Sequence, residues 1–167
     1  MLRPWSDEHR VPFAGMHADP EVMVDLGGPI GHSESDAKLD RYRRAYAEHS
    51  LSRWAVETLD GDFLGYVGVM PRPSPEHPLG SHFEVGWRLV RRAWDKGYAT
   101  ESARAALDDA FRRVGPGEIV SYTSADNSRS QAVMARLGLL RDTRRDFTAE
   151  YEDVGRWQGL VWVAFPT

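Results

Sequence analysis

The chain has 167 residues and no cysteine, so it has the length of one domain and can form neither disulfides nor thiolate metal sites. Lys and Arg number 21 against 25 Asp and Glu, and the resulting net charge of −4 argues against a general nucleic-acid binder. No apolar run approaches the roughly 18 residues of a membrane span and the N-terminus lacks a signal-peptide core, so we expect one cytoplasmic domain over residues 1–167.

Two short helices are predicted at the start of the chain. Ser6 begins the first, which is expected to end near Met16. Asp19 followed by Pro20 is typical of an N-cap with proline at the first helical position, and this pair predicts the second helix.

A longer helix is predicted next. Ser33 and Asp36 resemble the capping box that stands in front of such a helix. Its apolar residues recur at steps of three and four, which predicts a single buried stripe formed by Leu39, Tyr42, Tyr46 and His49.

Three strands are predicted in the middle of the chain. Residues 52–59 alternate in polarity and Asp60-Gly61 is a hairpin-turn signal. The return strand is expected to place one set of alternating residues on one face, namely Phe63, Gly65, Val67 and Val69. A proline-rich stretch, residues 71–80, joins this hairpin to a third strand over residues 83–89. In the third strand one face carries Phe83, Val85, Trp87 and Leu89, and the other carries Glu84, Gly86 and Arg88.

The rest of the chain predicts a helix from Tyr98 to Val114, a strand over residues 119–123 and a helix from Asn127 to Gly138. Residues 139–165 resemble two strands joined by a long polar loop. This order predicts an α/β (α+β) fold with a mixed central sheet and helices on its faces.

The most informative segment is residues 84–101, where a strand passes through a turn into a helix. The first amides of a helix lack an internal partner and the dipole there is positive, so such an end binds phosphate if the backbone is accessible. Gly97 and Ala99 give that access. The residues expected to contact a phosphate are Arg92, Lys96, Gly97, Tyr98, Ala99 and Thr100. The P-loop and dinucleotide-binding glycine patterns are absent, and an ordinary strand-to-helix turn is the alternative.

This segment resembles motif A of the GNAT acetyltransferase superfamily, where a six-residue pattern ending Gly-x-Gly/Ala holds the pyrophosphate of acetyl-CoA. The six positions here are residues 94–99, and their surroundings resemble the ribosomal-protein-alanine acetyltransferase (RimJ/RimL-like) branch. Asp95 stands where that branch usually has glycine. Further segments agree in order over nearly the whole chain: Leu2-Arg3-Pro4-Trp5, Asp19-Pro20-Glu21-Val22, Trp54-Ala55-Val56, Gly65-Tyr66-Val67-Gly68, Asn127, Ser130 and residues 133–138.

The resemblance implies a single GNAT-like domain in which two neighbouring strands splay apart. It also implies transfer of an acetyl (acyl) group from acetyl-CoA to a primary amine by direct attack in a ternary complex. The pantetheine arm is expected to contact Trp87, Leu89, Val90, Asn127 and Ser130. Ser130 is expected to protonate the leaving thiolate, and a backbone amide of the strand to stabilise the oxyanion. Asn127 is also a candidate for a simple N-cap.

Glu84 is the candidate general base, because it projects on the face opposite Phe83 and Val85, where the cofactor strand ends. The alternative is that Glu84 pairs with Arg88 or with another arginine nearby. Glu150 and Glu152 are rival candidates for the base.

Other site types are not indicated. The six histidines show no H-x-x-x-H spacing, so no metal site is expected. The expected acceptor is a small-molecule amine or a protein N-terminus, with no nucleic acid or membrane as partner. A homodimer is left open, and the alternative function is a non-catalytic acyl-CoA sensor.

Overall fold

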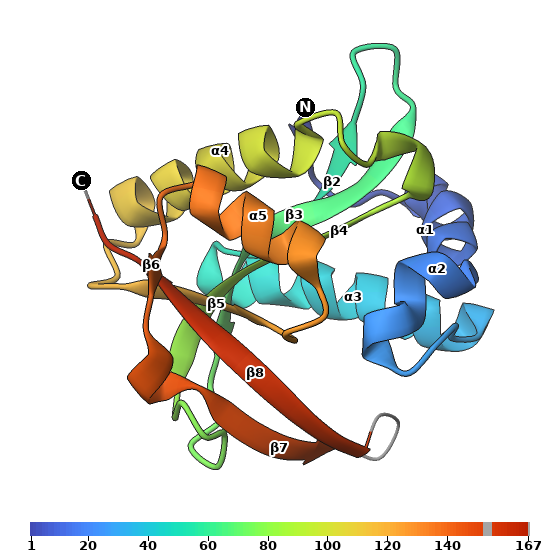
Figure 1. Cartoon of the computed structure of the whole chain (residues 1–167). Helices are drawn as coiled ribbons and strands as arrows, with labels where there is room; N and C mark the ends of the chain where they lie inside the picture. The colour runs from blue at the N-terminus through green and yellow to red at the C-terminus, as the bar shows by residue number, and fades with distance from the viewer. Residues whose placement is uncertain (152–154, 167) are drawn as a thin grey trace.

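The computed structural model describes residues 1–151 and 155–166, which form one mixed sheet with helices on both faces (Figure 1). The helices in this part of the chain are η1 (Asp7–His9), α1 (Arg10–His17), α2 (Pro20–Met23), η2 (Val24–Leu26), α3 (His32–His49), η3 (Arg91–Ala93), α4 (Tyr98–Arg113), α5 (Ser128–Arg136) and η4 (Thr143–Arg145). The strands are β1 (Leu2–Arg3), β2 (Arg53–Glu57), β3 (Phe63–Arg72), β4 (His82–Leu89), β5 (Ile119–Thr123), β6 (Leu140–Arg141), β7 (Phe147–Tyr151) and β8 (Gly155–Ala164).

The sheet has the strand order β1-β2-β3-β4-β5-β8-β6, with β7 added on β8. Strands β3 and β4 pair antiparallel along their length, from Gly65 opposite Leu89 to Arg72 opposite His82. Strands β4 and β5 are parallel and pair at one position, where Glu84 lies opposite Val120. Beyond this point the two strands diverge. The predicted splaying of two neighbouring strands is therefore found between β4 and β5.

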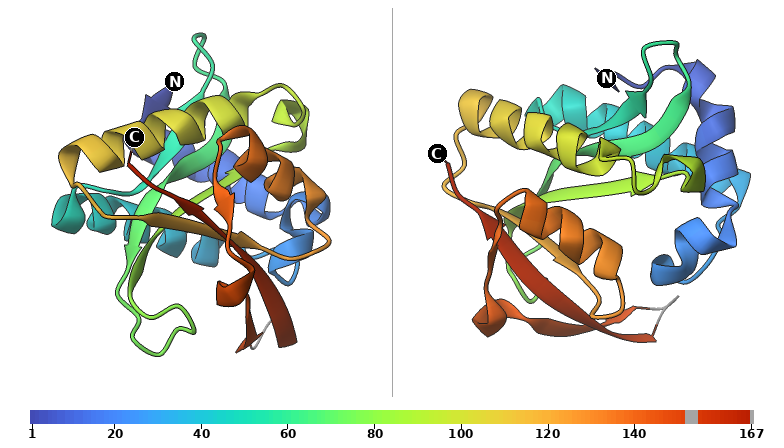
Figure 2. Two further views of the ribbon diagram at one scale, coloured as in Figure 1. Left: turned by 60° about the vertical axis from the view of Figure 1, so that its left-hand side comes forward. Right: turned by 45° about the horizontal axis from the view of Figure 1, so that its top comes forward.

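The two faces of the sheet carry different helices (Figure 2). Helix α4 buries Leu107 and three small side chains, which let it lie close against β3 and β4: Ala103, Ala106 and Ala110. Helices α1 and α3 cover the other face, where Phe13, Leu39 and Tyr42 pack against Tyr66 of β3. The predicted α/β architecture is confirmed.

Strand β3 contains an irregularity at Gly65, which has a φ of +136°. A Cβ atom there would lie 2.2 Å from the carbonyl oxygen of Arg88, so only glycine fits. The pairing with β2 shifts by one residue at this place. As a result Phe63 faces α1 and α3 while Val67 faces α4, and the prediction that both share one face is wrong.

The beginning of α3 also differs from the expectation. The helix begins at His32 with Gly31 as N-cap and no side-chain cap, so the predicted capping box at Ser33 is wrong. The buried stripe is formed by Ser35, Leu39, Tyr42 and Ala45, whereas Tyr46 and His49 are exposed. By contrast, the Asp19 N-cap is confirmed, because its side chain accepts a bond of 2.9 Å from the N–H of Glu21.

The C-terminal part contains more strand than predicted. Most of the expected long loop is β7, which pairs antiparallel with β8 from Phe147 opposite Gly159 to Tyr151 opposite Gly155. Among the described residues, no helix is both long and apolar enough to cross a membrane.

Candidate active site

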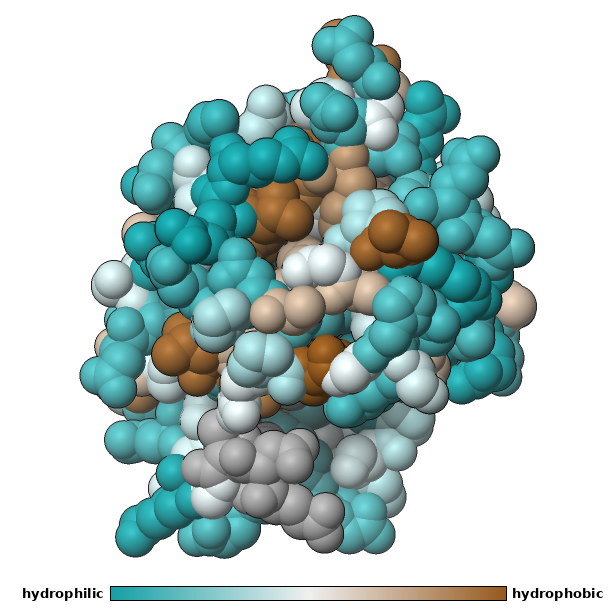
Figure 3. Space-filling model, turned by 90° about the vertical axis from the view of Figure 1, so that its right-hand side faces the viewer, coloured by the Kyte–Doolittle hydropathy of each residue, from teal (hydrophilic) through white to brown (hydrophobic). Residues whose placement is uncertain are grey.

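A cavity of about 820 Å³ opens where β4 and β5 diverge and extends to α3 and η2. One face of the molecule shows apolar side chains gathered in a hollow with hydrophilic side chains around it (Figure 3). Four residues predicted from the sequence line the cavity: Glu84, Trp87, Asn127 and Ser130. The structure thus brings the two predicted catalytic residues and part of the predicted cofactor set into one space.

The predicted phosphate-binding turn joins β4 to α4. Gly97 is the N-cap of α4 with a φ of +83°, and a Cβ atom built there would meet no atom within 4 Å. The indole N–H of Trp94 donates to the carbonyl of Leu89 at 2.9 Å, which ties the turn to the end of β4. The first amides of α4 are therefore accessible at Gly97, and Tyr98, Ala99 and Thr100 lie half-buried behind it.

Other predicted residues of the turn hold it to the sheet. The N–H of Val90 donates to the carbonyl of Leu64 at 2.9 Å, so this amide is not free to bond a cofactor. Arg92 donates to the carbonyl of Phe63 at 2.7 Å. Leu89 is buried and Lys96 is exposed. Both predicted cationic side chains are exposed, but Arg92 is already hydrogen-bonded to the sheet, which leaves Lys96 as the one available beside the turn.

Asp95 has a left-handed backbone, with a φ of +58°. This is the conformation that glycine adopts most readily. The carboxylate of Asp95 is exposed and lies in a recess that also contains Arg91 and Arg92.

Asp95→Gly is expected to tighten acetyl-CoA binding about twofold to fivefold, because a negative charge near a helix N-terminus competes with phosphate at about 0.3–1 kcal/mol. Calorimetry at low salt measures the change, which should shrink as salt is added. Asp95→Asn removes the charge without the backbone change. If both variants bind like the parent, the carboxylate does not influence the phosphate site.

Asn127 is the N-cap of α5, since its side-chain oxygen accepts from the N–H of Ser130 at 3.1 Å. Its amide nitrogen also donates to Asp25 at 3.2 Å. The same carboxylate of Asp25 accepts from both terminal nitrogens of Arg88, at 2.9 and 3.2 Å. Asp25, on η2, therefore connects β4 to α5 across the place where β4 and β5 diverge. Its partners are 63 and 102 residues away in sequence, so no local pattern could have identified it.

Glu84 is buried and bonded by two arginines. Arg53 donates to one carboxylate oxygen at 2.9 Å, Arg72 donates to the other, and the hydroxyl of Tyr122 lies 3.3 Å from that second oxygen. Burial alone would raise the pKa of Glu84, but Arg53 and Arg72 outweigh it and hold the pKa below its usual value. A carboxylate with a lowered pKa is a weaker base, so this geometry favours the alternative that Glu84 pairs with arginines.

The rival bases are not drawn into the cavity. Glu150 lies on β7 and is exposed, and Glu152 lies outside the described residues. Arg88, the first partner considered for Glu84, pairs with Asp25 instead. The base role of Glu84 stays a prediction. Within the described ranges, no cluster of three or more His, Cys, Asp or Glu side chains could hold a metal ion.

The chain is similar to acetyltransferases in sequence and in fold. The family model described as an acetyltransferase (GNAT) domain matches residues 1–140. An Aspergillus fumigatus protein, FsC-acetyl coenzyme A-N(2)-transacetylase, is 33% identical over 144 residues, which cover 83% of this chain. This chain spans only 61% of that relative.

Solved structures share the fold. An acetyltransferase from Agrobacterium tumefaciens superposes with a TM-score of 0.78 at 24% identity, covering 99% of this chain and 90% of the other. A spermidine N-acetyltransferase from Vibrio cholerae, solved with CoA and spermine, superposes with a TM-score of 0.76 at 15% identity, covering 99% and 94%. Identities this low establish the shared architecture alone.

Proposed function

This chain belongs to the GNAT acetyltransferase family, and we propose that it transfers an acetyl group from acetyl-CoA to a primary amine by direct attack in a ternary complex. The observation that carries the proposal is the divergence of β4 and β5 directly beside the N-terminus of α4. The unpaired edge of β4 can hydrogen-bond the amides of a pantetheine arm. The free N–H groups at the start of α4 can bind the pyrophosphate of the same cofactor.

The residues present fit acetyl-CoA. The open space above Gly97 lets a phosphate approach the first amides of α4, and exposed Lys96 supplies a positive charge. Trp87 and Ser130 line the cleft in which the pantetheine arm would lie. The bound cofactor supplies an acetyl group activated as a thioester, and a backbone N–H group of the open β4 edge would stabilise negative charge on its oxygen.

The cavity continues past the cleft toward α3, which leaves room for an acceptor. The names of these two similar proteins support an amine acceptor, since one is an N(2)-transacetylase and the other a spermidine N-acetyltransferase. An amine with a pKa of about 10.4 is neutral in roughly one molecule per thousand at pH 7, whereas an α-amine near 8 is neutral in about one per ten. A base is therefore needed far less for a protein N-terminus than for a lysine-like amine.

Ser130→Ala is expected to lower kcat more than it weakens acetyl-CoA binding. The hydroxyl of Ser130 would protonate the departing thiolate, a contribution made mainly as the bond breaks, and general acid catalysis is worth roughly 10²-fold or more. Its backbone N–H, which caps the helix with Asn127, is unchanged by the substitution. Steady-state kinetics and calorimetry separate the two effects. A variant with the parent's kcat would leave Ser130 a helix residue only.

The proposed function is tested by measuring CoA release from acetyl-CoA with a panel of amines. The panel contains amino acids, polyamines, aminoglycosides and a peptide with an N-terminal alanine, the last of which tests the proposed ribosomal-protein-alanine branch. Turnover of any amine supports the transferase. Tight acetyl-CoA binding with no turnover across the panel would instead indicate the non-catalytic sensor.

A further inference from the structure

The cavity that includes the proposed cofactor cleft is positively charged although the chain is negative. Six basic side chains and four acidic ones line it, an excess of two positive charges, while the whole chain carries −4. Two of the acidic groups, Asp25 and Glu84, are already bound to arginines. A cavity with this excess attracts anions and repels cations.

Lys38 contributes a charge that the protein does not neutralise. It lies on the face of α3 that lines the cavity and is half-buried. In the described part of the chain it forms no ion pair, although Glu34 is one turn away on the same face. Burial lowers the pKa of Lys38, Arg41 and Arg88 lower it further, and the opposing effects of Tyr66 and Glu34 only partly offset this. Burying an ammonium group without an ion-pair partner costs free energy. The position of Lys38 therefore points to an anionic partner that a bound ligand supplies.

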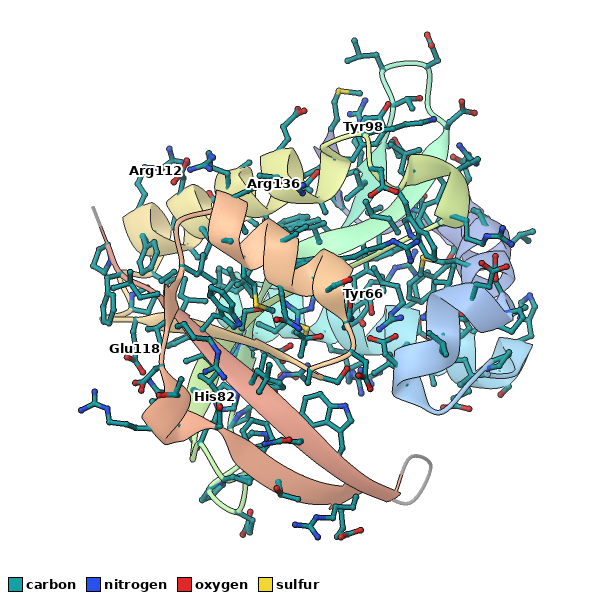
Figure 4. All side chains as sticks on the ribbon, in the orientation of Figure 1. Tyr66, His82, Tyr98, Arg112, Glu118 and Arg136 are labelled. Carbon is teal, nitrogen blue, oxygen red and sulfur yellow. The ribbon has the colours of Figure 1, made fainter. Side chains whose placement is uncertain are left out.

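Neighbouring groups respond to the same positive charge. Tyr66 projects from β3 into the interior (labelled in Figure 4) and is buried against Tyr42. Burial would raise the pKa of Tyr66, but Arg88, Lys38 and Arg53 together lower it. His17 is fully buried, and burial with Lys38 and Arg88 lowers its pKa to about 3. The same two cations, Lys38 and Arg88, therefore lower the pKa of both Tyr66 and His17.

We propose that the amine acceptor of this protein carries a carboxylate, which Lys38 binds in the cavity between α3 and the β4–β5 cleft. The inference rests on the proposed acetyl transfer and names the class of its acceptor: amino acids and other amino-carboxylates rather than polyamines. Arg88 is held by Asp25, Arg53 and Arg72 are held by Glu84, and Arg41 and Arg44 are exposed to solvent. Lys38 is therefore the half-buried cation of the cavity that is left to meet the ligand. The same field favours the neutral form of a nearby amine, which reduces the need for a base.

The test uses pairs of acceptors that differ in one charge. β-Alanine and γ-aminobutyrate are titrated by calorimetry into the protein–CoA complex, which cannot turn over, and compared with their primary amides. The acids are expected to bind about 10-fold to 100-fold more tightly than the amides, the value of one charge-assisted contact. Lys38→Met should remove this preference without loss of thermal stability, because it deletes an unpaired charge and keeps the side-chain length.

Arg43→Met is the matched control. Arg43 lies on the same helix but pairs with Asp7 away from the cavity, so this variant should keep the preference. Equal binding of acids and amides, no measurable binding of either, or a preference that survives Lys38→Met would overturn the inference. Turnover is measured separately. If the amides and spermidine are acetylated as fast as the acids, the proposed transferase function stands and the inference is wrong. Selective binding of acids with no turnover of any amine leaves the carboxylate site at Lys38 standing and the proposed function wrong.

Discussion

Glu84→Gln is expected to destabilise the protein by about 3 kcal/mol, because it leaves the buried Arg53 and the partly exposed Arg72 without their counter-charge. Arg53 is only 3% exposed and also donates to the backbone carbonyls of Gly68 and Glu84, so its guanidinium cannot move out into water. For a chain of this length the loss corresponds to a fall in Tm of about 6–12 °C. Thermal and urea unfolding measure it.

The pH dependence identifies the charge as the cause. The pKa of Glu84 is lowered in the folded state, so its stabilisation is complete above the unfolded pKa of about 4.3 and is lost as pH falls through the folded value. Parent and variant should therefore differ most near neutral pH and converge in acid. Asp109→Asn is the control, since its ion pair with Arg113 on the surface of α4 is worth only about 0.3–0.5 kcal/mol.

The same variant also decides whether Glu84 is the base. With a structural role, the remaining activity follows the parent's pH–rate curve. With a base role, kcat would fall roughly 10²–10⁴-fold at neutral pH and recover in part at high pH, where more amine is neutral. The second pattern with an unchanged Tm would mean that the paired carboxylate still accepts a proton.

Gly97→Glu should weaken acetyl-CoA binding at least 100-fold. The new carboxylate would occupy the empty space above the first amides of α4, where the phosphates are proposed to bind. Nothing lies within 4 Å of the added Cβ, so the protein should still fold, at a cost of about 1–2 kcal/mol for a positive φ in a residue with a side chain. Calorimetry with acetyl-CoA measures the change.

Gly97→Ala carries the same backbone strain without the charge or the bulk. It should bind acetyl-CoA far better than Gly97→Glu while being destabilised to a similar extent. Unchanged affinity in Gly97→Glu would show that the phosphates bind elsewhere, and the assignment of the turn would then fail.

Local signals in the sequence predicted the elements that depend on neighbouring residues. The N-cap at Asp19, the strand over residues 119–123 and the glycine at the start of α4 are each set within a few residues. The irregularity at Gly65 was missed because the need for glycine there is set by the carbonyl of Arg88 on the next strand. Periodicity alone could not distinguish it from a regular strand.

The charge partners could not be predicted in the same way. The spacing placed Glu84 and Arg88 on one face of a strand, which made them appear natural partners. In the fold Glu84 binds Arg53, 31 residues away, and Arg88 binds Asp25, 63 residues away. The fold brings charged residues from distant parts of the chain next to each of these two side chains. Spacing along one strand cannot identify such distant partners.

The divergence of β4 and β5 also bears on association with other chains. A strand edge with unpaired N–H and C=O groups usually invites another β-strand, and proteins protect such edges. Here the open edge of β4 faces an internal cleft, and Asp25 spans that cleft from Arg88 to Asn127. An incoming β-strand would meet this bridge before it could pair along β4. The Asp25 bridge therefore guards the open edge of β4 against edge-to-edge association.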